Sequence, residues 1–179
     1  MLKQISLLIL CAVAIVLFAT PVHACTSAVV SGKVTLDGRP LLWKNRDTDF
    51  MRNHVDYVKG ERYDFIAVVN SANAYLKEAW MGTNSAGFAL MNTQSYNLVD
   101  VKGDEERGAA NGRVIYRAPE VCATVEDFCH FLDTISKPSD IEANFGVIDA
   151  QGGAAMFEVD YYKYVMYDCL LYTSDAADD

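Results

Sequence analysis

Residues 22–47 of the chain read VHACTSAVVSGKVTLDGRPLLWKNRD. Two apolar runs, 25–34 and 39–47, lie on either side of Leu36-Asp37-Gly38, and an Asp-Gly pair between such runs is a strong hairpin signal. The stretch therefore predicts two antiparallel strands, the first beginning at Cys25 and the second ending in a charged cluster. Because the second strand of a hairpin lies beside the first, we expect that cluster close to Cys25.

The residues before Cys25 have the pattern of a secretory signal. Lys3 supplies a positive charge, residues 7–18 are almost wholly apolar, and Val22-His23-Ala24 forms a small-residue cleavage site. The apolar run is shorter than the about 20 residues that span a bilayer. We expect residues 1–24 to be removed on export to a bacterial periplasm or medium. That leaves Cys25 as the N-terminus, with no stable membrane insertion.

The composition indicates one acidic domain. The 179 residues are roughly one domain's worth, and a net charge of -9 with an isoelectric point near 4.7 argues against nucleic-acid partners. Cys122 and Cys129 lie in one expected helix at a separation of about 10 Å, which is too far for a disulfide. No set of His, Cys and carboxylate residues has the spacing of a zinc site. We therefore expect no metal and no cofactor.

The rest of the chain predicts an α+β fold, because strands are followed by helices and then by strands again. A capping box at Thr124 and Asp127 marks one helix start, and Val125, Phe128, Phe131 and Leu132 form its apolar stripe. A turn is expected at 82–85 and a charged loop at 100–112. The further strands are expected at 65–72, 74–82, 87–96, 144–150 and 154–167, and the helices at 113–123 and 124–136.

The C-terminal residues raise a separate point. The last stretch, DCLLYTSDAADD, has no periodicity and resembles translated sequencing-adapter read-through. We interpret residues 169–179 as a non-native tail, with a natural acidic tail as the alternative. The domain would then cover residues 25–168 and be cut short at its C-terminal end.

Cys25 needs a base in order to react, since a thiol with a pKa near 8.5 is only partly ionised at neutral pH. The papain-type signature around a catalytic cysteine is absent. His54 is one of two histidines that remain after the signal, and His130 is interpreted as structural beside Asp127. An N-terminal cysteine has its own α-amine, with a pKa near 7.7, tethered beside the sulfur. Around it, Lys44 and Arg46 can favour a thiolate, and Asp47 or Asp49 can hold the amine.

Three motifs occur in an order that resembles one family. They are ACTSAVVSGKVTLDGRPLLWKNRDTD at 24–49, WMGTNSAGFALMN at 80–92 and NFGVIDAQGGAAMFE at 144–158. This order is similar to that of the cysteine N-terminal-nucleophile (Ntn) amidases, a group of linear amide hydrolases. The group contains choloylglycine hydrolase, penicillin V acylase and acyl-coenzyme A:6-aminopenicillanic acid acyltransferase. The resemblance implies a four-layer αββα sandwich, and hydrolysis or acyl transfer through a thioester on an N-terminal cysteine.

The resemblance implies a candidate catalytic set. Cys25 matches the nucleophile, with its α-amine as the base, and Asp47 matches the carboxylate that positions that amine. Lys44 stands where the family usually has arginine, and it cannot form a bidentate fork, so either Lys44 or Arg46 carries the cationic role. Asn92 resembles the asparagine that donates to the oxyanion. The alternative for Asn92 is a polar residue on the solvent face of a strand.

The resemblance leaves the substrate open among small-molecule amides, requires no cofactor, and leaves a homo-oligomer open. Asn84 is interpreted as a turn residue. An apolar acyl pocket or the core is expected to contain Trp43, Phe50, Met51, Tyr57 and Trp80.

Two alternatives come from other classes of protein. In a bacterial lipoprotein a lipid thioether on Cys25 would abolish the nucleophile, and Val22-His23-Ala24-Cys25 nearly fits the lipid-attachment pattern. An apolar strand nevertheless begins at once, where lipoproteins have a polar tether. A secreted β-rich binding protein is the second alternative, and in it Cys25 would tolerate replacement.

Overall fold

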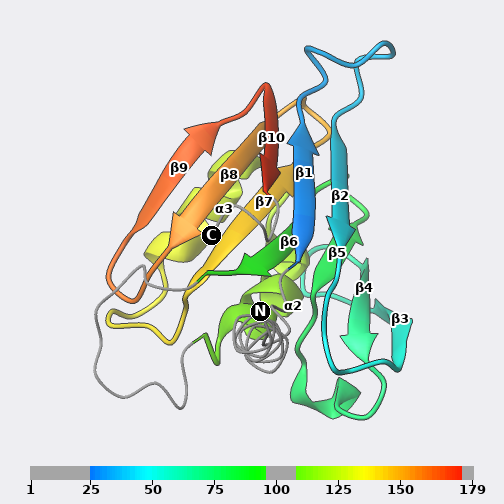
Figure 1. Ribbon diagram of the computed structural model, residues 1–179, viewed down its shortest axis with the longest axis vertical. Coiled ribbons are helices and arrows are strands. Elements are labelled where there is room, and N and C mark those ends of the chain that lie inside the picture. The colour runs from blue at the N-terminus through cyan, green and yellow to red at the C-terminus, as the bar shows by residue number, and fades with distance from the viewer. Residues whose placement is uncertain (1–24, 96–107, 175–179) are drawn as a thin grey trace, which may run out of the picture.

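The computed structural model describes residues 25–95 and 108–174 (Figure 1). Its larger sheet has seven strands, every neighbouring pair antiparallel, in the order β3-β4-β5-β6-β7-β8-β9. The strands therefore follow one another in the chain, and both helices are inserted between β6 and β7. The seven strands are β3 (Asn53–Val58), β4 (Phe65–Asn70), β5 (Met81–Asn84), β6 (Ala89–Gln94), β7 (Ala143–Ile148), β8 (Ala154–Val159) and β9 (Tyr164–Asp168).

A smaller antiparallel sheet contains the predicted N-terminal hairpin. β1 (Thr26–Val30) pairs with β2 (Leu41–Asn45) on one side and with β10 (Leu171–Ser174) on the other. Gly38 in the connection has φ +75°, a backbone conformation that glycine adopts without steric cost. The predicted pairing of the two strands is therefore confirmed, but both strands are shorter than the sequence indicated. Residues 31–40 join them, so the expected tight turn at Asp37-Gly38 is wrong and that pair lies inside a longer connection.

The two sheets and the helices form three layers. Helices α2 (Asn111–Val121) and α3 (Val125–Asp133) cover one face of the large sheet, and the small sheet lies against the other face (Figure 1). Gly146 of β7 makes the second contact close, because a Cβ there would lie 2.7 Å from Val29 Cγ2 and 3.2 Å from Leu42 Cδ1. The α+β class is thus confirmed, with antiparallel sheets.

Helix α3 begins where the sequence predicted. Thr124 Oγ1 accepts from the Asp127 backbone N–H at 3.0 Å, and Asp127 Oδ2 accepts from the Thr124 backbone N–H at 3.1 Å. Phe128 and Leu132 of the predicted stripe are fully buried. The Phe128 ring packs among Phe88, Phe131, Phe145 and Phe157, with its centroid 5.0 Å from that of Phe157.

Several expected elements differ from the structure. The strand predicted at 74–82 is wrong: residues 74–76 form the 3₁₀ turn η1 (Ala74–Leu76), and β5 begins only at Met81. The expected turn at 82–85 is displaced, since the chain reverses at residues 85–88, where Gly87 has φ +85°. The run 154–167 divides into β8 and β9, and β3 was not predicted. These segments are short, and their partners in the sheet decide their conformation.

The described cysteines are free, including Cys122 and Cys129, as predicted. They do not share a helix, however, because Cys122 follows the end of α2 and Cys129 lies in α3. Most of the expected charged loop lies outside the described residues, and its last two residues, 111 and 112, belong to α2. β10 falls within residues 169–179, and the non-native origin of that stretch stays a prediction.

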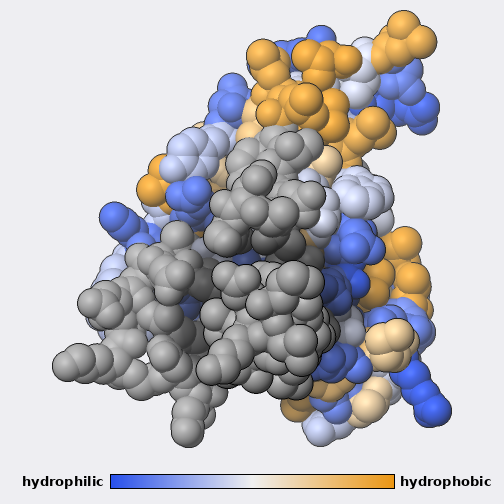
Figure 2. All heavy atoms as spheres, in the orientation of Figure 1, coloured by the Kyte–Doolittle hydropathy of each residue, from blue (hydrophilic) through white to orange (hydrophobic). Residues whose placement is uncertain are grey.

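The outer face of the small sheet is apolar and exposed. Val30 lies opposite Leu41 on β2 and Leu171 on β10, and the side chains of Leu41 and Leu171 are 56% and 65% exposed. Trp43, opposite Ala28, is 53% exposed. Figure 2 shows apolar residues gathered at the top of the view, at the end of the molecule where the connection between β1 and β2 lies in Figure 1. Among the described helices, none is long and apolar enough to cross a membrane.

Candidate active site

Cys25 lies immediately before β1. Ser27 and Val29 are buried against the large sheet, and Cys25 shares their face because side chains alternate along a strand. The thiol is half-buried, and its Sγ lies 3.9 Å from the backbone oxygen of Asp47, to which it donates. The hairpin therefore brings the end of β2 back to Cys25, as the sequence predicted.

Lys44 connects this hairpin to the large sheet. It lies opposite Ser27 in the β1–β2 pair, and its Nζ donates to the Trp80 backbone oxygen at 3.1 Å and to Asn92 Oδ1 at 3.2 Å. Desolvation lowers the pKa of Lys44 to about 8; Cys25 acts in the opposite direction and raises it, and Arg46 lowers it further. Lys44 is therefore a cation held by neutral acceptors, close enough to Cys25 to interact with its charge.

Arg46 contacts the ring of Trp80. The centre of its guanidinium lies 4.6 Å from the centroid of the Trp80 ring, a cation–π distance, and its Nη1 donates to Asn53 Oδ1. Burial lowers the pKa of Arg46 and Cys25 opposes that shift. Both cations predicted near Cys25 thus interact electrostatically with it, and each has different partners.

Asn92 is buried in β6, with 3% of its surface exposed, so the alternative of a solvent-facing residue is wrong. β5 begins at Met81, which pairs with Met91. The next residue of β6, Asn92, therefore has no partner residue in β5. Lys44 reaches Asn92 Oδ1 past this strand end. An ammonium has only donors, so the Asn92 oxygen must face Lys44 and the two N–H groups must point elsewhere.

Asp47 contacts Cys25 through its backbone oxygen. The structure places the main chain of Asp47 against Cys25 and leaves the side chain exposed, so the role of its carboxylate stays a prediction.

Asn84 is more than a turn residue. Its Oδ1 accepts from the backbone of Ala86 and Phe88, and its Nδ2 donates to the carbonyls of Pro119 and Cys122. These bonds fasten the β5–β6 turn to the end of α2.

The histidines have partners away from Cys25. His54 Nδ1 lies 3.0 Å from Ser71 Oγ, and His130 Nε2 lies 3.9 Å from Glu126 Oε1, with both side chains exposed. The expected neighbour of His130, Asp127, instead caps α3. Among the described residues, no group of three or more His, Cys, Asp or Glu side chains is placed to hold a metal ion.

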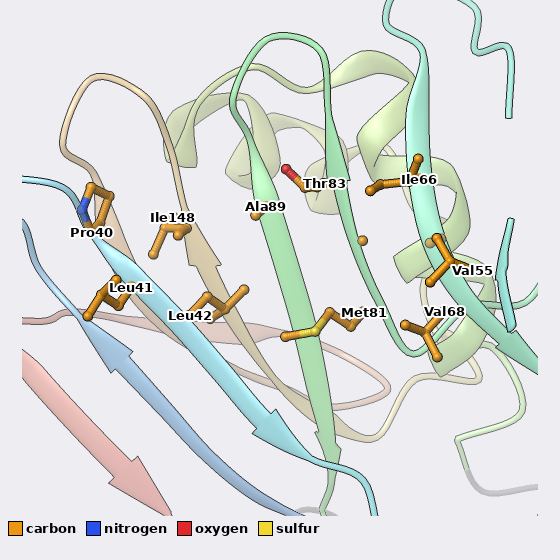
Figure 3. Close-up of a pocket in the computed structure, with 12 residues that line it drawn as sticks. Pro40, Leu41, Leu42, Val55, Ile66, Val68, Met81, Thr83, Ala89 and Ile148 are labelled. Atoms are coloured by element: carbon orange, nitrogen blue, oxygen red, sulfur yellow. The ribbon is translucent and has the colours of Figure 1, made fainter. Parts of the chain in front are cut away.

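The expected aromatic acyl pocket is not formed by the residues proposed for it. Trp43, Phe50, Met51 and Tyr57 are exposed, and Trp80 is half-buried beneath Arg46. A pocket of about 410 Å³ lies instead between β2 and strands β3–β5 (Figure 3). Its residues come from separate strands, so no local pattern reveals it. It is lined by apolar side chains that include Leu42, Val55, Ile66, Val68, Met81 and Ile148.

Comparison with solved structures identifies a shared fold. A mutant of the conjugated bile acid hydrolase from Clostridium perfringens superposes with a TM-score of 0.53 at 14% identity, over 82% of this chain and 51% of that chain. The chain shares its fold with part of a bile acid hydrolase. Penicillin V acylase from Agrobacterium tumefaciens matches with a TM-score of 0.36 at 18% identity, over 82% and 42% of the two chains. No protein-family model and no curated protein matches the sequence.

The chain therefore has the structural similarity to Ntn hydrolases that its motifs predicted, and it spans about half the length of the bile acid hydrolase. The likeness at this identity concerns the fold alone. The sequence did not predict the role of Trp80 in the site, where its carbonyl accepts from Lys44 and its ring lies under Arg46. A lone tryptophan before a short strand gives no local signal for that role.

Proposed function

We propose that the complete protein is a cysteine N-terminal-nucleophile amidohydrolase that cleaves the linear amide bond of a small N-acyl compound. The observation that carries the proposal is the return of β2 to Cys25, with the Sγ at 3.9 Å from the Asp47 carbonyl and Lys44 bound to Asn92 beside it. An incidental cysteine would not require a half-buried cation and a buried amide close to it.

The reaction begins at the α-amine that removal of residues 1–24 would expose. The neutral amine takes the thiol proton, and the thiolate forms a bond to the amide carbon. The amide nitrogen leaves with that proton, giving a thioester on Cys25. Water or another acceptor then releases the acyl group. Lys44 and Arg46 favour the thiolate, and the Asp47 carboxylate holds the amine in position.

The negative oxygen that forms on the amide carbon needs hydrogen-bond donors. Asn92 presents two N–H groups away from Lys44, and we assign them to this oxygen. Removal of one such donor typically costs about 10²- to 10³-fold in kcat. Two observations favour Asn92 for this role: its side chain is buried, and it is bonded to Lys44, which interacts with the charge of Cys25.

We also propose that the complete protein has the four-layer αββα sandwich. The apolar row of the exposed Leu41 and Leu171 with the half-buried Val30 between them, and the exposed Trp43 nearby, has the character of an interior surface. A helical layer over this face would complete the sandwich. Export of the protein through cleavage of residues 1–24 belongs to the same proposal, and those residues lie outside the described part.

The test is trapping of the acyl-enzyme by intact mass. Exported protein is incubated briefly with a panel of N-acyl amides, quenched in acid and digested, and the acyl adduct is expected on Cys25. Cys25→Ala should lose both adduct and turnover, whereas Cys129→Ala, at a half-buried cysteine in α3, should keep both. A diacylglyceryl adduct on Cys25 would instead indicate the lipoprotein. Unchanged activity of Cys25→Ala would contradict the proposal.

A further inference from the structure

The contacts of Lys44 show more than a positive charge near a thiol. Its Nζ has two acceptors, the Trp80 carbonyl at 3.1 Å in the segment just before β5 and Asn92 Oδ1 at 3.2 Å in β6. We propose that Lys44 is a positioning residue that fixes the orientation of the Asn92 amide, so that its N–H groups serve the acyl oxygen at Cys25. This inference rests on the proposed function, and it assigns a task to the lysine that replaces the usual arginine.

The chemistry of the two groups makes the orientation one-sided. An ammonium can only donate, so the Asn92 oxygen is its partner, and the bond is strengthened by the charge. Turning the amide over would bring its N–H groups against the ammonium. Because Asn92 is 97% buried, no bulk water compensates for the lost bond. Lys44 thus holds the two N–H donors in a single orientation before a substrate arrives.

Arg46 is not placed to do the same work. Its guanidinium lies over the Trp80 ring and donates to Asn53, and neither contact involves the Asn92 amide. The two cations therefore contact different groups of Trp80: Lys44 donates to its carbonyl, and Arg46 lies over its ring. Both cations contribute charge to the surroundings of Cys25, and Lys44 in addition acts on Asn92.

The charge of Lys44 is sensitive to pH in a way that the charge of an arginine is not. Desolvation lowers its pKa to about 8. The charged groups that face it are Cys25 before β1, which favours the ammonium, and Arg46 after β2, which opposes it. Its partners from β6 and from the segment before β5, Asn92 and the Trp80 carbonyl, are uncharged. The hold on Asn92 should therefore weaken as the pH rises through about 8, because a neutral amine makes weaker hydrogen bonds.

A double-mutant cycle on the complete protein tests the coupling. Asn92→Ala should lower kcat by about 10²- to 10³-fold, and Lys44→Met should lower kcat by about tenfold or more with little change in KM. In the Asn92→Ala background, Lys44→Met should cost several-fold less than in the wild type, because its Asn92 target is gone and only its charge near Cys25 is still lost. Arg46→Met is the matched comparison, and its cost should be the same in both backgrounds. Equal cost of Lys44→Met in both backgrounds would overturn the inference and leave the proposed function standing.

A second readout does not depend on turnover. With asparagine selectively labelled with ¹⁵N, the side-chain amide signals of Asn92 should shift with a midpoint near pH 8, and Lys44→Met should remove that midpoint. A midpoint that survives in Lys44→Met would overturn the coupling whatever the activity. A midpoint that disappears as expected, in a protein whose Cys25 is never acylated, would refute the proposed function and with it the catalytic use of the Lys44–Asn92 bond.

Discussion

Two buried asparagines show how the same side chain does different work. The amide of Asn84 bonds only to backbone groups, which makes it part of the framework. The amide of Asn92 accepts from Lys44, a half-buried cation that interacts with the charge of Cys25. The sequence singled out both residues by resemblance, but it left Asn92 between an active-site residue and a solvent-facing one. Burial decides between these, and burial depends on strands that are distant in the chain.

At this scale the lowered pKa of Lys44 predicts a pH dependence of stability. In the unfolded chain the amine binds its proton up to about pH 10.5, whereas in the folded protein it releases it near pH 8. Between these values the unfolded state binds more protons, so folding becomes more favourable as the pH rises. We expect the free energy of unfolding, measured in urea, to rise from pH 8 to 10 relative to Lys44→Met. A difference between the two proteins that is constant with pH would contradict this expectation.

At the scale of elements, local signals predicted the structure where local hydrogen bonds determine it. Thr124 with Asp127 indicated the start of α3. Asp37-Gly38 indicated that β1 and β2 pair, although residues 31–40 join the strands and no tight turn forms at that dipeptide. The segment 74–82 was misread because its apolar residues resemble a strand, although the sheet pairs only from Met81 onward. Local pattern cannot give that boundary, since β4 and β6 set it.

The link between α3 and the β7–β8 turn yields a stability prediction. The carboxylate of Asp149 is buried and accepts from the backbone N–H groups of Val125, Gln151 and Gly153 at 2.8–2.9 Å. Asp149→Ala leaves these donors without their acceptor, and we expect it to lower the free energy of unfolding by about 3 kcal/mol or more. Glu126→Ala, at an exposed position on α3, should change it by less than about 0.5 kcal/mol. Similar small effects of both substitutions in denaturant unfolding would be evidence against this link.

At the scale of the whole molecule, the sheets bring together residues that no sequence window contains. Lys44 meets Asn92 across 48 positions, and the apolar pocket is built from strands of both sheets. The order of three motifs nevertheless predicted the class of fold, because that order reflects the succession of strands. The sequence did not reveal which faces stay uncovered, such as the outer face of the small sheet.

That face makes the four-layer proposal testable. Trp43 is 53% exposed on it. If a further layer covers Trp43 in the complete protein, Trp43→Lys buries a charge there and should lower the free energy of unfolding by about 3 kcal/mol. Residues 25–179 produced alone should aggregate through uncovered strand edges, and Trp43→Lys should make them more soluble. A complete protein unaffected by Trp43→Lys, or a soluble wild-type fragment that unfolds cooperatively, would count against the missing layer.

The central claim is that Cys25 reacts as an N-terminal residue, and one added residue tests it most directly. An extra glycine retained before Cys25 keeps the thiol, Lys44, Arg46 and Asn92 but converts the α-amine into an amide without useful basicity. The rate of Cys25 acylation, followed by rapid quench and intact mass, is the measurement. We predict a loss of about 10²- to 10⁴-fold, as expected for a missing general base. Acylation at the full rate, with the extra glycine confirmed by mass, would contradict the N-terminal-nucleophile mechanism.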